Sequence, residues 1–181
     1  EISLAGGSWA QRDKLGTRYG SEIVNLVSDP TRSGALGSFG WDDDGTPSHR
    51  SDLVRDGVLV GYLSGWQSAG RAGYEPAGTA RSDGWAGYPI DRMANVDLEP
   101  GTAGSLKDLI ANTESGFLLS NNRSWSIDQL RLNFQFGCEV AWEIKDGELG
   151  TMYRDPLYVG RTPEFWGSCD AICGPEAWHS W

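Results

Sequence analysis

Few residues of this chain have the types and the spacing that metal-dependent catalysis requires. Its 181 residues include two histidines, His49 and His179, and three cysteines. Histidines so far apart in the sequence cannot form the closely spaced pair with which a helix holds zinc. The remaining candidate metal site is Cys169, Cys173 and His179, but a closed structural zinc site needs a fourth ligand. The residues themselves therefore favour buried or incidental cysteines over a metal site.

Other catalytic arrangements are also incomplete in the sequence. A Ser-His-acid triad is formally possible through either histidine, but there is no Gly-x-Ser-x-Gly elbow. No glycine-rich phosphate loop stands between an expected strand and an expected helix. The adjacent Asp42, Asp43 and Asp44 would point apart on an extended segment, whereas calcium loops alternate their ligands. We interpret these three residues as an acidic turn.

Charge and composition limit the classes of partner. The net charge is −10 and the sequence pI is about 4.6. Without a cluster of Lys and Arg, direct binding to nucleic acid is disfavoured, because phosphate contacts supply most of its affinity. No apolar run approaches the ~18–20 residues that a membrane span needs. Three cysteines without a disulfide-framework spacing indicate a reduced, cytoplasmic chain.

Residues 130–145 are the strongest structural signal. Apolar and polar side chains alternate there without a break, which predicts an extended strand with one apolar face and excludes a helix. The length of this run predicts a bend or bulge, which we place at Gly137. Asp146 and Gly147 then suit a two-residue hairpin turn, with residues 148–152 returning as the partner strand.

The remaining elements are shorter. Asp56 and Gly57 predict a second hairpin over residues 53–63. Ser105 and Asp108 have the spacing of a capping box for a helix over residues 104–116, with Gly116 as its left-handed stop. A second short helix is expected from Thr162 towards residue 174. Further strands are expected at residues 23–27, near Phe39, and at 89–98, 117–119 and 157–159, with a polar loop at 121–128.

These elements predict a mainly β protein of the α+β class. We expect a large antiparallel, barrel-like sheet with one or two short helices packed on it, forming a single domain over residues 1–181. Residues 64–87 show no apolar periodicity, and a segment of that kind inside a compact domain is commonly functional or mobile.

Several stretches, taken together and in order, resemble the C-terminal domain of the TldD/PmbA family. Its members are called modulators of DNA gyrase, or TldD/TldE peptide-maturation proteases. The similarity covers nearly the whole chain, and residues 130–147 are closer to the metal-bearing TldD branch than to TldE. The matching blocks are residues 34–47, 53–63, 92–95, 98–101, 106–113, 134–137 and 139–147.

The resemblance implies a zinc metallopeptidase whose metal is held by a helix with a His-Glu-x-x-x-His motif and by the cysteine of a Cys-Gly-Lys segment. Neither motif occurs in this sequence. Cys173 is followed by Gly174 but not by the required Lys, so we do not assign it as a ligand. We expect the N-terminal domain and the zinc-binding helix before Glu1 and the cysteine beyond Trp181. The chain would then be part of a longer protein and inactive alone.

The resemblance also implies a dimer with an identical or a TldE/PmbA-like subunit, enclosing a channel where an unfolded peptide lies as an added strand. We therefore predict the peptide- and partner-binding domain of a TldD-like zinc metallopeptidase acting on unfolded peptides or peptide precursors. The alternative is a non-catalytic TldE/PmbA-type interaction subunit. Candidate contacts with peptide or partner, which could instead belong to a plain surface loop, are Arg71, Arg81, Trp85, Tyr88, Arg92 and Asn95.

Overall fold

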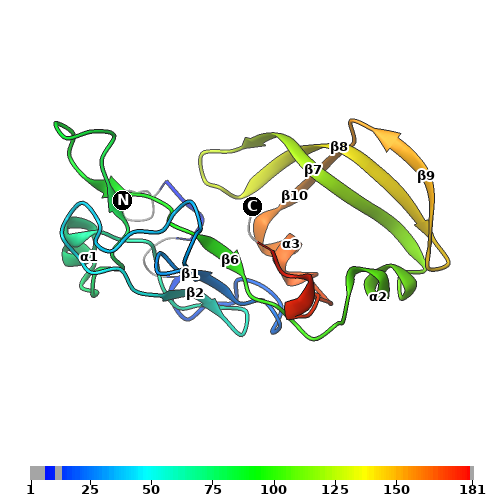
Figure 1. The fold of residues 1–181 in the computed structure, drawn as a ribbon, viewed down its shortest axis with the longest axis horizontal. Helices are drawn as coiled ribbons and strands as arrows, with labels where there is room; N and C mark the ends of the chain where they lie inside the picture. The colour runs from blue at the N-terminus through cyan, green and yellow to red at the C-terminus, as the bar shows by residue number, and fades with distance from the viewer. Residues whose placement is uncertain (1–6, 11–13, 180–181) are drawn as a thin grey trace. The chain divides into compact units, whose positions relative to one another are not determined.

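A computed structural model describes residues 7–10 and 14–179 of the chain. The chain divides into two compact units, Glu1–Glu99 and Pro100–Trp181, and each unit holds its own antiparallel sheet (Figure 1). The described helices are all too short or too polar to cross a bilayer.

The first unit is built on a four-stranded sheet with the order β3-β2-β1-β6. Its strands are β1 (Leu26–Ser28), β2 (Ser51–Arg55), β3 (Val58–Leu59) and β6 (Val96–Leu98). Every pair is antiparallel. Three valines of this unit are fully buried: Val24 just before β1, Val27 in β1 and Val54 in β2.

The hairpin between β2 and β3 has the turn that the sequence predicts. Asp56 and Gly57 both have positive φ values, 50° and 71°. Positive φ values at both central residues define a type I′ turn, whose twist matches that of the flanking strands. Asp-Gly adopts this turn readily. The expected strand over residues 23–27 is also present, although it begins later, at Leu26.

The segment predicted to be irregular contains a helix and a small ribbon. Helix α1 (Trp66–Ala72) buries its small side chains, and Gly73 ends it in the left-handed conformation. Strands β4 (Ala80–Arg81) and β5 (Ile90–Asp91) form a separate two-stranded sheet. The prediction of one strand over residues 89–98 is wrong, because β5 and β6 belong to different sheets and residues 92–95 connect them.

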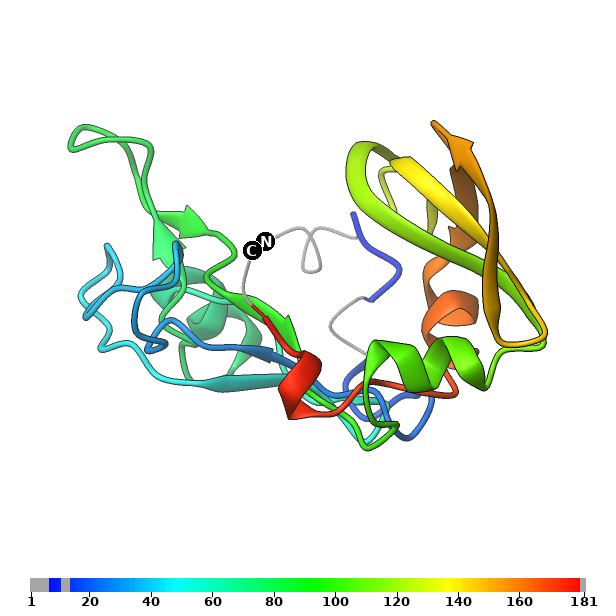
Figure 2. The same cartoon turned by 45° about the vertical axis from the view of Figure 1, so that its right-hand side comes forward.

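The second unit is a meander around one long strand, β8 (Asn133–Lys145). One side of β8 pairs with β7 (Ser115–Ile127) over almost its whole length. Its other side is shared, since β10 (Leu157–Arg161) pairs with the first half and β9 (Glu148–Arg154) with the second half. Figures 1 and 2 show this arrangement, with β8 between β7 and the other two strands. The predicted long strand is therefore confirmed from Asn133 onwards, whereas residues 130–132 lie in the turn before it. The predicted return over residues 148–152 is also confirmed.

The predicted irregularity at Gly137 is present, but its extra residue lies in the partner strand. Gly137 pairs with Ser124 and Cys138 pairs with Asn122, so β7 advances by two residues where β8 advances by one. Arg123 is thus the bulged residue. The expected polar loop over residues 121–128 is wrong, because β7 continues to Ile127.

Helix α2 (Leu106–Ala111) confirms the capping box. The Ser105 side chain accepts a hydrogen bond from the Asp108 amide, and the Asp108 carboxylate accepts one from the Ser105 amide. Hydrogen bonds from Ser105 also lower the pKa of Asp108 below its usual value. The expected stop at Gly116 is wrong, since Asn112 caps the helix and Gly116 already belongs to β7.

The remaining helical segments are short. Helix α3 (Thr162–Gly167) starts at the expected residue but ends well before residue 174, and a 3-10 turn follows at Pro175–Ala177. The fold class is confirmed as mainly antiparallel β with a few short helices. The described strands do not close into a barrel.

Candidate binding pocket

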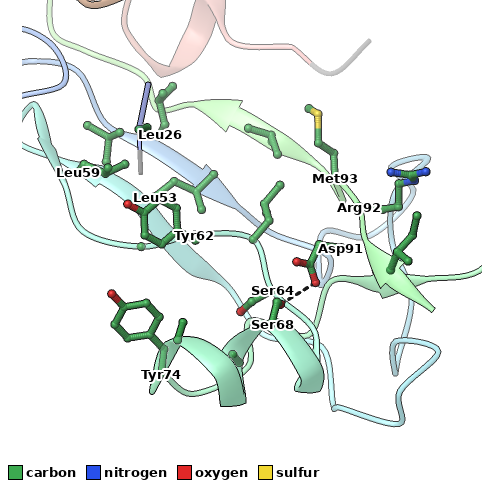
Figure 3. Close-up of a pocket in the computed structure, with 18 of the residues that line it drawn as sticks. Leu26, Leu53, Leu59, Tyr62, Ser64, Ser68, Tyr74, Asp91, Arg92 and Met93 are labelled. Atoms are coloured by element: carbon green, nitrogen blue, oxygen red, sulfur yellow. Dashed lines mark hydrogen bonds between the residues drawn. The ribbon is translucent and has the colours of Figure 1, made fainter. Parts of the chain in front are cut away.

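A pocket of about 690 Å³ lies in the first unit. The four-stranded sheet, α1 and the β4–β5 ribbon all contribute to its walls (Figure 3). Its volume falls within the range of small-molecule pockets. Most lining side chains are apolar, and those from the sheet and helix include Leu26, Leu53, Val54, Leu59, Ala69, Ala72 and Val96.

Small residues of α1 create space in the pocket. Ser68, Ala69 and Ala72 form the buried face of the helix and also line the pocket. Because these side chains are short, the helix leaves a hollow between itself and the sheet instead of filling it. Larger residues at these positions would occupy the pocket.

Aromatic side chains form one end of the pocket. The ring centroids of Tyr62 and Tyr74 are 6.4 Å apart, with the rings tilted by 37°. Tyr19, which also lines the pocket, stacks on Trp9 at 5.3 Å. Burial raises the pKa of Tyr19, so its phenol stays neutral at neutral pH. Aromatic rings of this kind favour large apolar or aromatic groups.

Polar atoms in the wall hold α1 against the β4–β5 ribbon. One oxygen of Asp91 accepts a hydrogen bond from the Gly65 amide at 2.7 Å. The same oxygen accepts one from the Ser68 hydroxyl at 2.8 Å (Figure 3). The Trp66 amide donates to Asp44 Oδ2 at 3.0 Å. The first amides of α1 are therefore satisfied by side chains that are distant in the sequence.

The structure separates the six residues that the sequence singled out. Arg81 and Arg92 both line the pocket, whereas Arg71 is exposed on α1 and does not. Trp85 and Tyr88 lie in the loop between β4 and β5, with 101% and 86% of their surfaces exposed. This loop extends away from the rest of its unit in Figure 2.

The side chain of Asn95 forms hydrogen bonds within the first unit. Its amide oxygen accepts a hydrogen bond from the Gly37 amide at 2.8 Å, and its nitrogen donates to the Asp29 carbonyl at 2.8 Å and to Ser38 Oγ at 3.0 Å. The side chain therefore joins the segment before β6 to residues 29–38. It acts as a structural link there rather than as a free contact for a ligand.

The described residues do not fit a zinc ion. Nowhere in residues 7–10 and 14–179 do three or more His, Cys, Asp or Glu side chains come close enough to hold a metal, so Cys169, Cys173 and His179 are not brought together. Burial also raises the pKa of the Cys169 thiol, which disfavours the thiolate that zinc requires.

Most of the pocket was missed in the sequence. Leu53, Tyr62 and Val96 were assigned to strands or turns, and α1 was not predicted. The available signal was the run of small residues Ser68, Ala69 and Ala72, which share one face at helical spacing.

Comparison with known proteins identifies the family. The family described as the PmbA/TldA metallopeptidase C-terminal domain matches residues 2–178, nearly the full length. This chain belongs to that family. A metalloprotease of Methanocaldococcus jannaschii is 34% identical to this PmbA/TldD domain over 161 residues, covering 89% of the chain and 35% of that protein. A metalloprotease TldD homolog of Buchnera aphidicola (strain APS) is 27% identical, covering 81% of the chain and 30% of that protein.

Solved structures agree with the fold of the PmbA/TldD domain. TldE from Thermococcus kodakarensis matches with a TM-score of 0.76 and 25% identity, over 89% of this chain and 36% of that one. A Thermotoga maritima protein, described as a candidate modulator of a DNA gyrase, matches with a TM-score of 0.83 and 20% identity, over 96% and 39%. The chain thus spans only about a third of the length of the relatives it matches.

Proposed function

We propose that this domain holds unfolded peptide for a TldD-like metallopeptidase. In this proposal the peptide lies as an added strand along β6, and its side chains enter the pocket of the first unit. The zinc and the hydrolytic groups belong to parts of the enzyme other than the described residues. The proposal places the protein in the cytoplasm and pairs it with an identical or TldE/PmbA-like subunit, in keeping with the metalloprotease and TldE relatives.

The position of β6 carries this proposal. In the part of the chain that the structure describes, β6 is an edge strand that pairs only with β1. The carbonyl of Asn95 and the amide of Glu99 bond towards the β1 side. Because backbone groups alternate along a strand, the amides and carbonyls of Val96 and Leu98 point to the open side.

The open edge lies next to the pocket. Val96 lines the pocket from β6, and Met93 lines it just before that strand begins. Hydrogen bonds to a strand edge are independent of sequence, and an adjoining pocket then selects alternate side chains. This combination suits a protein that takes unfolded peptides of varied sequence.

Leu98→Pro tests strand addition at this edge. Proline removes an amide that faces the open side, and it is tolerated on edge strands for that reason. Leu98→Ala is the matched control, because it shortens the side chain and keeps the amide. We expect Leu98→Pro to weaken the binding of a fluorescent unfolded peptide by about five- to ten-fold, the effect of one lost hydrogen bond, with little change in Leu98→Ala.

Hydrogen exchange gives an independent readout on the unchanged chain. Saturating peptide should slow amide exchange at Val96 and Leu98. Equal peptide affinity of both Leu98 variants and the parent chain, together with unchanged exchange at β6, would exclude this edge as the binding site.

A TldE-type interaction subunit without catalysis is the second candidate. The similarity to TldE from Thermococcus kodakarensis, at 25% identity over 89% of the chain, favours it. The two candidates differ in the metal content of the whole gene product that contains this domain. Bound zinc after dialysis supports the peptidase, and its absence supports the interaction subunit.

A further inference from the structure

Two arginines share one face of the β4–β5 ribbon at the pocket. Arg81 pairs with Ile90 across the ribbon, and the Arg92 amide bonds to the Thr79 carbonyl and so continues the ladder. Residues 90 and 92 lie on the same face of a strand, so Arg81 and Arg92 are diagonal neighbours across it. Both line the pocket.

Among the described residues, the side chains of Arg81 and Arg92 form no hydrogen bond or ion pair. The nearby carboxylate of Asp91 is engaged by the Gly65 amide and the Ser68 hydroxyl. Asp91 also lines this end of the pocket and offsets one of the two positive charges, so one net positive charge is left. A ligand carboxylate placed between the two guanidinium groups would neutralise it. The pocket is thus apolar with one cationic end.

Building on the peptide-binding function proposed above, we propose that the pocket receives the C-terminal end of a peptide. The terminal carboxylate lies at Arg81 and Arg92, and a large apolar or aromatic side chain of the last residues extends towards Tyr62 and Tyr74. Figure 3 shows Arg92 and the two tyrosines at opposite ends of the pocket.

Strand direction places the peptide terminus at the arginines. Arg92 and Met93 precede β6 in the sequence, so they lie at its starting end. Antiparallel pairing is the more stable arrangement, and a peptide antiparallel to β6 would finish beside that starting end. Its C-terminal carboxylate would therefore arrive next to Arg92.

The overall charge favours a terminal carboxylate over acidic side chains. At a net charge of −10 the chain repels peptides that are rich in Asp and Glu. A neutral or basic peptide with one carboxylate at its end avoids this repulsion and still meets the two arginines.

Fluorescence polarisation with three unfolded peptides tests the proposal. They share one neutral sequence ending in Phe, first as the free acid, second as the C-terminal amide, and third as the amide with an internal Asp near the end. We expect the free acid to bind about ten-fold more tightly than either amide, as a charge-assisted hydrogen bond predicts. Arg81→Gln and Arg92→Gln should each remove this preference and leave binding of the amide unchanged.

Arg71→Gln is the control, because Arg71 is exposed on α1 in the same unit and does not line the pocket. This variant should keep the preference for the free acid, and thermal unfolding should show that all three variants are folded. Equal binding of acid and amide, or tight binding of the Asp-containing amide, would overturn the terminal-carboxylate proposal while leaving peptide binding intact. Absence of binding by all three peptides would overturn the peptide-binding function as well.

Discussion

The carboxylate of Asp42 holds two distant segments of the first unit together. It is buried, with 7% of its surface exposed. One oxygen accepts hydrogen bonds from the Asp44 amide at 3.1 Å and the Thr46 amide at 2.8 Å, and the other accepts one from the Ala80 amide at 3.1 Å. The acidic turn predicted at this point is present, and this carboxylate extends its role to fixing the start of β4.

Asp42→Ala should therefore destabilise the first unit strongly. The substitution would leave the buried Thr46 and Ala80 amides without their partner, at a cost of about 2–4 kcal/mol in the free energy of unfolding. The control is Asp43→Ala, because Asp43 is exposed and accepts one amide hydrogen bond, from Ser82. Urea unfolding of both variants would measure the difference. Equal loss in the two would show that burial of Asp42 adds nothing.

At the scale of single elements, the β8–β9 turn also anchors helix α2. The Asp146 amide bonds to the Glu114 carbonyl at 2.7 Å, and the Gly147 amide bonds to the Thr113 carbonyl at 3.0 Å. Gly147 has a φ of +80°, and a Cβ there would lie 2.7 Å from the Ala111 carbonyl oxygen. The hairpin and the helix therefore meet through a glycine that has no room for a side chain.

Gly147→Ala should lower the free energy of unfolding by about 2–3 kcal/mol, because it combines a strained backbone with a close contact. Gly150→Ala in β9 is the matched control, since the nearest atom to its Cβ would be the Glu143 carbonyl oxygen at 3.7 Å. We expect a change within about 0.5 kcal/mol for the control. The measurement is chemical denaturation followed by circular dichroism. An unchanged free energy of unfolding in Gly147→Ala would mean that the contact with α2 can relax without cost.

Sequence reasoning succeeded where the determinants are local. The long strand follows from strict alternation over residues 130–145, and both hairpins follow from an Asp-Gly pair. The α2 start follows from Ser105 and Asp108 within one turn. Each signal lies inside the element that it specifies.

Helix α1 was missed because its determinants lie elsewhere in the chain. Its N-cap position, Gly65, provides no capping side chain. The amides at its start are instead bonded by Asp44 and Asp91, which are more than twenty residues away. The pocket depends on the same long-range contacts. The sequence therefore singled out Arg81 and Arg92 but not the apolar wall that gives them a shared site.

The polar half of β7 was mistaken for a loop for a related reason. Residues 121–127 are all exposed, so neither face needs apolar side chains. Pairing with β8 and the bulge at Arg123 define this part of the strand. An exposed edge strand of this kind leaves little periodicity in its sequence.

At the scale of the whole molecule, binding and hydrolysis are expected to be separable. The sequence holds two histidines, and the described residues include no group of side chains that could hold a metal. We expect this chain with added zinc to bind a quenched fluorogenic unfolded peptide without cleaving it. Fluorescence polarisation and the release of fluorescence measure the two properties on the same sample. Zinc-dependent cleavage that a chelator abolishes would contradict this separation.

The pairing of β1 with β6 has a consequence for how the protein is made. Strands β7 to β10 follow one another directly in the sequence. The strands of the second sheet can therefore pair through short connections as each one is synthesised. In contrast, Leu26 of β1 pairs with Leu98 of β6, and most of the sequence of the first unit lies between these two residues. Closing so long a loop is slow, because its entropy is lost before the contact is gained. During synthesis on the ribosome, β1 can therefore pair with β6 only after β6 has been made. The pocket can form only after Val96 has emerged from the exit tunnel.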